Sequence, residues 1–142
     1  MKNYSEKEVN ALIERFEKRK LPKLEWTHEA HLVVAIWYCN QYHLEEALDL
    51  VRNYIIKHNE SVGTENSDTE GYHETITRFW LIMARQFLRE IKESPLAEKC
   101  NALINSEMGK SSYPLTYYSK ELLFSVKARH NWVEPDLKAL IS

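Results

Sequence analysis

Four histidines occupy positions that a helical fold would gather in one place: His28, His31, His58 and His73. Neutral imidazole is a common ligand of divalent metals, and its unperturbed pKa of about 6.5 lets it titrate near physiological pH. A cluster of such residues therefore either holds a metal ion or responds to protons. Which of these applies depends on the elements that position the rings.

Capping residues and apolar spacing predict helices around these histidines. Ser5 and Glu8 match a capping box, which begins a first helix that continues to about residue 20. Thr27 is a favourable N-cap for a second helix that continues to about residue 42. Because residues 30–39 are apolar on nearly every side of this helix, we expect it to lie buried at the centre of the fold.

Helical periodicity continues through the rest of the chain. A single apolar stripe predicts a third helix over about 44–59. A second capping box at 67–70 predicts a long fourth helix over about 68–93. Pro95 suits the first turn of a fifth helix, and a shorter helix is expected over about 115–128.

The predicted fold class is all-α. Three glycines and four prolines leave few tight turns, which disfavours a multi-stranded sheet. We expect one domain over residues 1–142. Its predicted architecture is an antiparallel up-and-down helical bundle, with four core helices and one or two short C-terminal helices.

The order of the helices explains why the histidines should meet. Short connections make neighbouring helices antiparallel. If the second helix starts at one end of the bundle with His28 and His31, the third helix returns to that end with His58. The fourth helix then starts there with His73, and residues 115–119 follow at the same end.

One hypothesis is a metal centre formed by His28, His31 and His73. His28 and His31 lie three residues apart on one helix face, so both can reach one ion, and His73 would add a nitrogen from a facing helix. Three protein ligands leave a position for water or substrate, as in catalytic sites. The ion would be a divalent metal such as zinc, iron or nickel. Whether His58 joins the cluster stays open.

On this hypothesis the protein is a small metal-dependent enzyme that acts on a small polar molecule. The reaction would be hydrolytic or transferase-like, and an oxygen-using activity is also open. Glu74 or Glu29 would serve as the base for a metal-bound water, whose pKa the ion lowers towards about 7. Tyr72, Tyr118 and Arg129 are the candidates for binding the substrate.

Two hypotheses of other classes stay open. The N-termini of the second and fourth helices carry positive partial charge and would point at the same place, which favours an anion and keeps histidine neutral. The site would then be a metal-free ligand-binding module that responds to an anion or to pH. In the third hypothesis, one end or face of the bundle docks a protein partner.

Composition narrows the range of partners. The formal net charge is −2 and the basic residues are spread out, unlike the clustered excess typical of nucleic-acid binding. The longest apolar run, residues 32–39, is too short to cross a bilayer, and residues 1–5 lack the apolar core of a signal peptide. Cys39 and Cys100 have no metal-binding spacing, as expected for reduced thiols. We therefore expect a cytoplasmic protein whose partner is a small molecule or anion, with no nucleic acid and no membrane.

Three separated motifs carry a family resemblance. They are Trp-Thr-His-Glu-Ala-His-Leu at 26–32, Gly-Tyr-His-Glu-Thr-Ile-Thr at 71–77, and Tyr-Tyr-Ser-Lys-Glu-Leu-Leu-Phe-Ser at 117–125, followed by Ala128-Arg129 and Pro135-Asp136-Leu137. They resemble a family of small bacterial helical proteins that has no assigned activity, over most of the chain from Trp26 onward. The resemblance implies a bacterial, cytoplasmic origin and the same three segments as the site.

Overall fold

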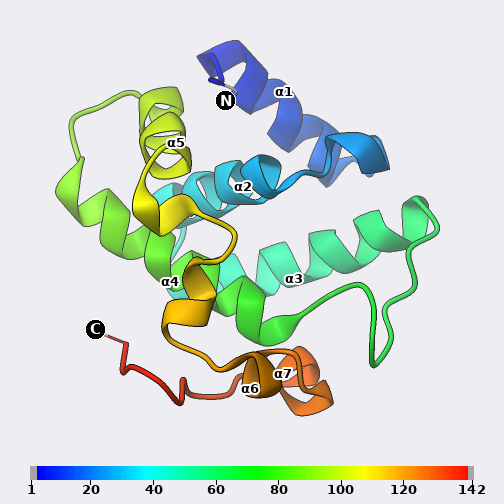
Figure 1. The fold of residues 1–142 in the computed structure, drawn as a ribbon. Helices are drawn as coiled ribbons and strands as arrows, with labels where there is room; N and C mark the ends of the chain where they lie inside the picture. The colour runs from blue at the N-terminus through cyan, green and yellow to red at the C-terminus, as the bar shows by residue number, and fades with distance from the viewer. Residues whose placement is uncertain (1–2, 141–142) are drawn as a thin grey trace.

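The computed structural model describes residues 3–140, which form seven α-helices, three short 3₁₀-helices and no strand (Figure 1). The α-helices are α1 (Glu6–Glu17), α2 (His28–Gln41), α3 (Leu44–Ser61), α4 (Glu74–Glu90), α5 (Leu96–Ile104), α6 (Lys120–Leu123) and α7 (Val126–His130). The 3₁₀-helices are η1 (Lys23–Glu25), η2 (Glu107–Gly109) and η3 (Tyr113–Thr116). None of the helices described here combines the length and the apolar character that a membrane span requires. The all-α class is confirmed for these residues, whereas the up-and-down order of the bundle stays a prediction.

Helix α2 lies at the centre of the fold, as its apolar sequence predicts. It contacts α1, α3, α4 and α5, which surround it in Figure 1. Its buried residues are Ala30, Leu32, Val33, Val34, Ala35, Ile36 and Tyr38. Burying each larger aliphatic side chain stabilises the fold by about 1.5–3 kcal/mol, so α2 supplies much of the core.

The two predicted N-caps at the start of the chain are confirmed. Ser5 and Glu8 form the full capping box of α1, and the Thr27 side chain accepts a hydrogen bond from the Ala30 amide at the start of α2. Helix α1 ends at Glu17, earlier than the predicted residue 20. Its end is closed by Arg19, which has a φ of 60° and so turns the chain out of the helix.

The predicted start of the fourth helix is wrong. The segment Ser67–Glu70 does not cap a helix but forms a turn, in which the Ser67 amide donates to the Glu70 carbonyl at 2.9 Å. Gly71 follows with a φ of +83°, a conformation that interrupts any helix at this point. Helix α4 begins instead at Glu74, and His73 is its N-cap.

The predicted helix over 115–128 is also wrong, because two serines divide it. The Ser119 side chain accepts from the Leu122 amide at 3.2 Å and begins α6. The Ser125 side chain accepts from the Ala128 amide at 3.1 Å and begins α7. Ser125 also donates to the Leu122 carbonyl at 2.7 Å, which closes the end of α6. The chain therefore folds here as a 3₁₀ turn and two short helices.

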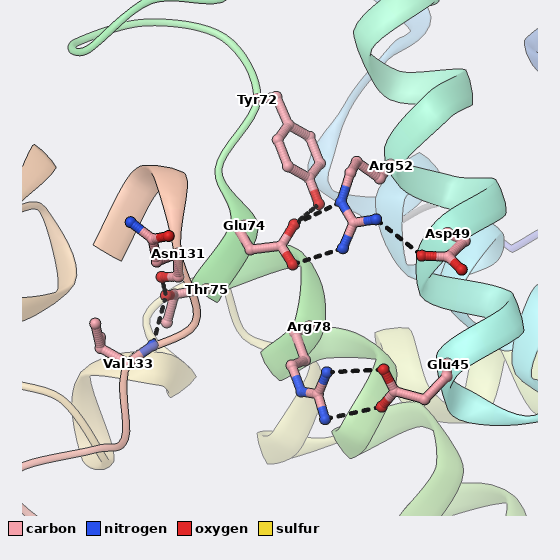
Figure 2. A network of polar contacts seen from close by, with 9 residues as sticks. All are labelled: Glu45, Asp49, Arg52, Tyr72, Glu74, Thr75, Arg78, Asn131 and Val133. Carbon is pink, nitrogen blue, oxygen red and sulfur yellow. Dashed lines mark hydrogen bonds and ion pairs between the residues drawn. The ribbon is translucent and has the colours of Figure 1, made fainter. Parts of the chain in front are cut away.

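Two buried hydroxyl groups attach the C-terminal segment to the rest of the fold. The Thr75 hydroxyl donates to the Asn131 carbonyl at 2.7 Å and accepts from the Val133 amide at 3.2 Å (Figure 2). The Tyr118 hydroxyl donates to the Val133 carbonyl at 2.6 Å. Because Thr75 belongs to the first turn of α4, these bonds hold α7 beside the N-terminus of that helix.

Candidate functional site

A cavity of about 450 Å³ lies where η1, the start of α2, the end of α3, the start of α4 and α7 meet. Three of the four histidines line it: His31, His58 and His73. The remaining lining residues are Lys23, Trp26, Ile55, Asn59, Val62, Thr64, Gly71, Tyr72, Ile76, Thr77, Phe124 and Arg129. We call this space the histidine cavity.

The His31 ring is fixed by its neighbours. Its Nδ1 lies 2.6 Å from the Thr27 carbonyl, so Nδ1 carries the proton and Nε2 presents a lone pair. The ring stacks on Trp26, with 3.7 Å between the ring centroids. Burial lowers the pKa of His31 to about 4. The hydrogen bond to Thr27 acts in the opposite direction and raises the pKa, whereas the nearby His28 and His58 lower it further. His31 is therefore neutral at pH 7.

His58 is fully buried and has one unsatisfied nitrogen. Its Nε2 donates to the Leu21 carbonyl at 2.9 Å, so Nδ1 is the ring nitrogen that can accept a hydrogen bond. This Nδ1 is buried and has no hydrogen-bond partner among residues 3–140. A buried polar atom without a partner is uncommon in native structures and calls for an explanation.

Both nitrogens of His73 are already engaged. The Nε2 atom donates to the Leu123 carbonyl at 2.8 Å, and Nδ1 accepts from the Ile76 amide at 3.1 Å as the N-cap of α4. Burial is the main cause that lowers the pKa of His73, and the nearby Arg129 contributes. His73 therefore supports the cavity wall and has no lone pair left for a ligand.

His28 faces away from the histidine cavity. Its Nε2 lies 2.7 Å from the Gly109 carbonyl, and its ring packs edge-on against Trp80, with 5.2 Å between the centroids. Gly109 is closely surrounded, because a Cβ atom there would lie 2.0 Å from the Leu103 carbonyl oxygen. His28 thus secures η2 rather than the site.

The predicted metal centre of His28, His31 and His73 is therefore not formed. In the described part of the chain, no group of three or more His, Cys, Asp or Glu residues is arranged to hold a metal ion. His28 points to another part of the fold and His73 has no free nitrogen, so the residues present do not fit the zinc, iron or nickel site expected from the sequence.

Neither predicted catalytic carboxylate lines the histidine cavity. Glu74 forms a bidentate ion pair with Arg52, at 2.9 Å and 2.7 Å, and accepts from the Tyr72 hydroxyl at 2.7 Å (Figure 2). Burial would raise the pKa of Glu74, but the hydrogen bonds from Arg52 and Tyr72 outweigh it and hold the pKa below its usual value. Glu29 lines a separate groove beside Arg15.

The Glu74 ion pair gives a first prediction about stability. The Glu74 side chain is 13% exposed, so Glu74→Gln should lower the free energy of unfolding by about 2 kcal/mol. This loss is smaller than that expected for a fully buried ion pair, because Arg52 keeps its bond to Asp49. The effect should shrink as the pH falls below 4.5, because protonation removes the charge that Arg52 stabilises. Urea unfolding of both proteins at several pH values measures it.

Glu45→Gln is the matched control for this prediction. Glu45 of α3 forms an ion pair with Arg78, which lies one turn after Glu74 on α4 (Figure 2). The Glu45 side chain, however, is 71% exposed. Solvent screens such a pair, so the expected loss is below about 1 kcal/mol. Equal losses in the two variants would contradict the assigned difference in burial.

Two of the three predicted substrate-binding residues line the histidine cavity. Tyr72 and Arg129 do, and Arg129 is held by its Nη1, which donates to the Gly71 carbonyl at 3.0 Å and to the Tyr72 carbonyl at 3.3 Å. Tyr118 does not. Its ring is buried, its hydroxyl donates to the Val133 carbonyl, and burial raises its pKa. Tyr118 therefore holds the C-terminal segment in place and is not available to a substrate.

Sequence reasoning missed Lys23, which adds a second cation to the cavity. Lys23 is exposed in η1, three residues before Trp26, and its side chain has no hydrogen-bond or ion-pair partner within residues 3–140. Its position in the sequence could have indicated this role, because Lys23 lies in the short connection that leads to the second helix, close to the first histidines. With Arg129 it makes the lining basic, and none of the lining residues is Asp or Glu.

Comparison with known proteins adds no assignment to this site. No protein-family model, curated protein or solved structure matches the chain.

Proposed function

We propose that the protein is a ligand-binding module that holds a small organic anion in the histidine cavity without a metal ion. The observation that carries this proposal is the charge of the lining. Lys23 and Arg129 contribute two positive charges, and no lining residue contributes a negative one. An anion in this space is therefore attracted by both cations and is repelled by no carboxylate of the lining.

The donors of Arg129 are suited to an anionic group. Among residues 3–140, only Nη1 of this side chain donates to the protein, so Nε and Nη2 stay available. A guanidinium binds carboxylate or phosphate oxygens with paired hydrogen bonds in a fixed geometry. Lys23 supplies a mobile ammonium group from η1. Together they can hold an anion between η1 and α7.

The rest of the lining favours an organic ligand over a simple inorganic ion. Trp26, Ile55 and Ile76 present apolar surface, and Phe124 lines the same space although its side chain is 61% exposed. A volume of about 450 Å³ is within the usual range for small-molecule sites, which are mostly apolar with a few polar groups. A bound organic anion would cover part of the exposed Phe124 ring.

Binding of carboxylates to the chain of residues 1–142, without a polyhistidine tag, tests the proposal. Isothermal titration calorimetry at pH 7 would compare 3-methylbutanoate with its uncharged amide, and inorganic phosphate would serve as a second probe. We expect saturable binding of the carboxylate and none of the amide. Lys23→Gln should weaken binding about fivefold, because it removes one of two cations from the lining.

Lys127→Gln is the matched control. Lys127 is an exposed residue of α7 with the same charge but does not line the cavity. Its loss should change the affinity less than twofold. If neither anion binds, or if Lys127→Gln weakens binding as much as Lys23→Gln, the proposed site is wrong.

A further inference from the structure

Two histidine ring nitrogens at the histidine cavity receive no hydrogen bond. His31 Nε2 and His58 Nδ1 both carry lone pairs, because the other nitrogen of each ring donates to a backbone carbonyl. Neither lone pair accepts a hydrogen bond from any group within residues 3–140, and the His58 ring is fully buried. Both rings pack against the indole of Trp26, and the distances between ring centroids are 3.7 Å for His31 and 5.3 Å for His58.

A small apolar pocket shares part of its wall with the histidine cavity. Trp26, His31, Ile55, Ile76 and Thr77 line both spaces. The second space, about 40 Å³, extends between α2, α3 and α4, where its further lining residues are Val34, Ala35, Val51, Trp80 and Leu81. A cavity needs about 10–15 Å³ to hold one water molecule, so a space of about 40 Å³ has room for two or three carbon atoms.

The charges of the lining exclude one common class of ligand. An amino acid would bring an ammonium group as its donor, and an ammonium ion removed from water needs a carboxylate partner. The cavity lining has no Asp or Glu. A neutral hydroxyl group satisfies a histidine lone pair without adding charge. The donor that fits is therefore a hydroxyl group.

On the basis of the proposed function, we infer that the ligand is a hydroxycarboxylate with a short branched or linear apolar side chain. Its carboxylate lies between Lys23 and Arg129, its hydroxyl donates to Nε2 of His31, and its side chain enters the apolar pocket. His31 is then the residue that selects hydroxy acids from other carboxylates. It contacts both the polar and the apolar part of the ligand, since it lines both spaces.

Four ligands that differ by one group at a time test this inference by calorimetry. They are 2-hydroxy-3-methylbutanoate, 3-methylbutanoate, valine and 2-hydroxypropanoate. The hydroxy acid should bind about fivefold more tightly than 3-methylbutanoate, which lacks the hydroxyl, and more tightly than valine. It should bind about tenfold more tightly than 2-hydroxypropanoate, because its side chain buries two further carbon atoms.

The variant His31→Phe tests the assigned acceptor. Phenylalanine keeps a ring against Trp26 but has no lone pair, so the preference for the hydroxy acid over 3-methylbutanoate should disappear. His43→Phe is the control, because His43 is exposed at the start of α3 and does not line the cavity. If His31→Phe does not fold, ¹⁵N-labelled histidine in the wild type gives a second measurement, since accepting a hydrogen bond shifts the Nε2 resonance of His31.

The outcomes separate this inference from the proposed function. Equal binding of the hydroxy acid and 3-methylbutanoate, or an unchanged His31 resonance, overturns the inference and leaves anion binding in place. Tighter binding of valine overturns the charge argument against amino acids. Failure of every carboxylate to bind overturns the proposed function as well.

Discussion

Thr75→Val is expected to lower the free energy of unfolding by about 3 kcal/mol, although the two side chains have nearly the same shape. The Thr75 hydroxyl is completely buried and bonds both the Asn131 carbonyl and the Val133 amide. Valine would leave the buried Val133 amide without a partner, at a cost of about 1–3 kcal/mol, and would also remove the bond to the carbonyl of Asn131, an exposed residue. Equilibrium unfolding in urea, followed by circular dichroism, measures the difference.

Thr116→Val is the control for this prediction. Thr116 is exposed at the end of η3, so the same chemical change there should alter stability by less than about 0.5 kcal/mol. A loss in Thr75→Val no larger than in the control would show that the C-terminal segment does not depend on this hydroxyl. Since Arg129 precedes the attached segment, Thr75→Val should also weaken anion binding.

The stability of the wild type is expected to fall by about 2 kcal/mol more than that of His31→Phe when the pH is lowered from 8 to 5. Burial lowers the pKa of His31 to about 4 in the folded protein, from 6.5 for the free side chain. Between these two values the unfolded chain binds a proton that the folded protein excludes, so acid favours unfolding. Above pH 6.5 both states are neutral and the contribution is constant.

Unfolding curves for the two proteins at pH 8, 6.5, 5 and 4 measure this contribution. Comparing wild type with His31→Phe cancels the effect of other groups, such as His73, whose pKa is also lowered. Parallel stability profiles would mean that His31 titrates normally and is open to water. A wild type that gains stability relative to the variant in acid would mean that the His31 pKa is raised instead.

Much of the fold could be predicted because local signals decide it. Ser5 and Thr27 mark helix starts by capping bonds within three residues, and both caps are present in the structure. The misplaced start of α4 has a different cause, because two possible caps compete. Ser67 is the stronger residue by type, but the glycine at 71 adopts a positive φ and leaves His73 as the cap.

The divided helix near the C-terminus carried a readable signal. Ser119 and Ser125 lie six residues apart, and each is a favourable N-cap residue, so the segment contains two helix starts rather than one. Helical periodicity alone does not separate these cases. The exposure of Phe124, between the two short helices, follows from that division.

The candidate site could be located from the sequence, but its chemistry could not be assigned. Of the four histidines expected at one end of the bundle, His31, His58 and His73 line one cavity, whereas His28 does not. Whether a ring nitrogen is free depends on carbonyl groups that lie far away in the chain. His73 is bonded to the carbonyl of Leu123, 50 positions later, and no spacing rule reveals that contact.

The long-range bonds that complete the histidine cavity also set the order in which it can form during synthesis. His73, Thr75 and Arg129 each bond to groups 50 to 58 positions away, so long loops must close before these contacts exist. The ribosome releases the chain from its N-terminus, and α1 to α4 emerge first. The parts of the wall contributed by Phe124 and Arg129 are added only after these four helices have emerged. The nascent chain therefore carries the histidines well before it has a site in which they act.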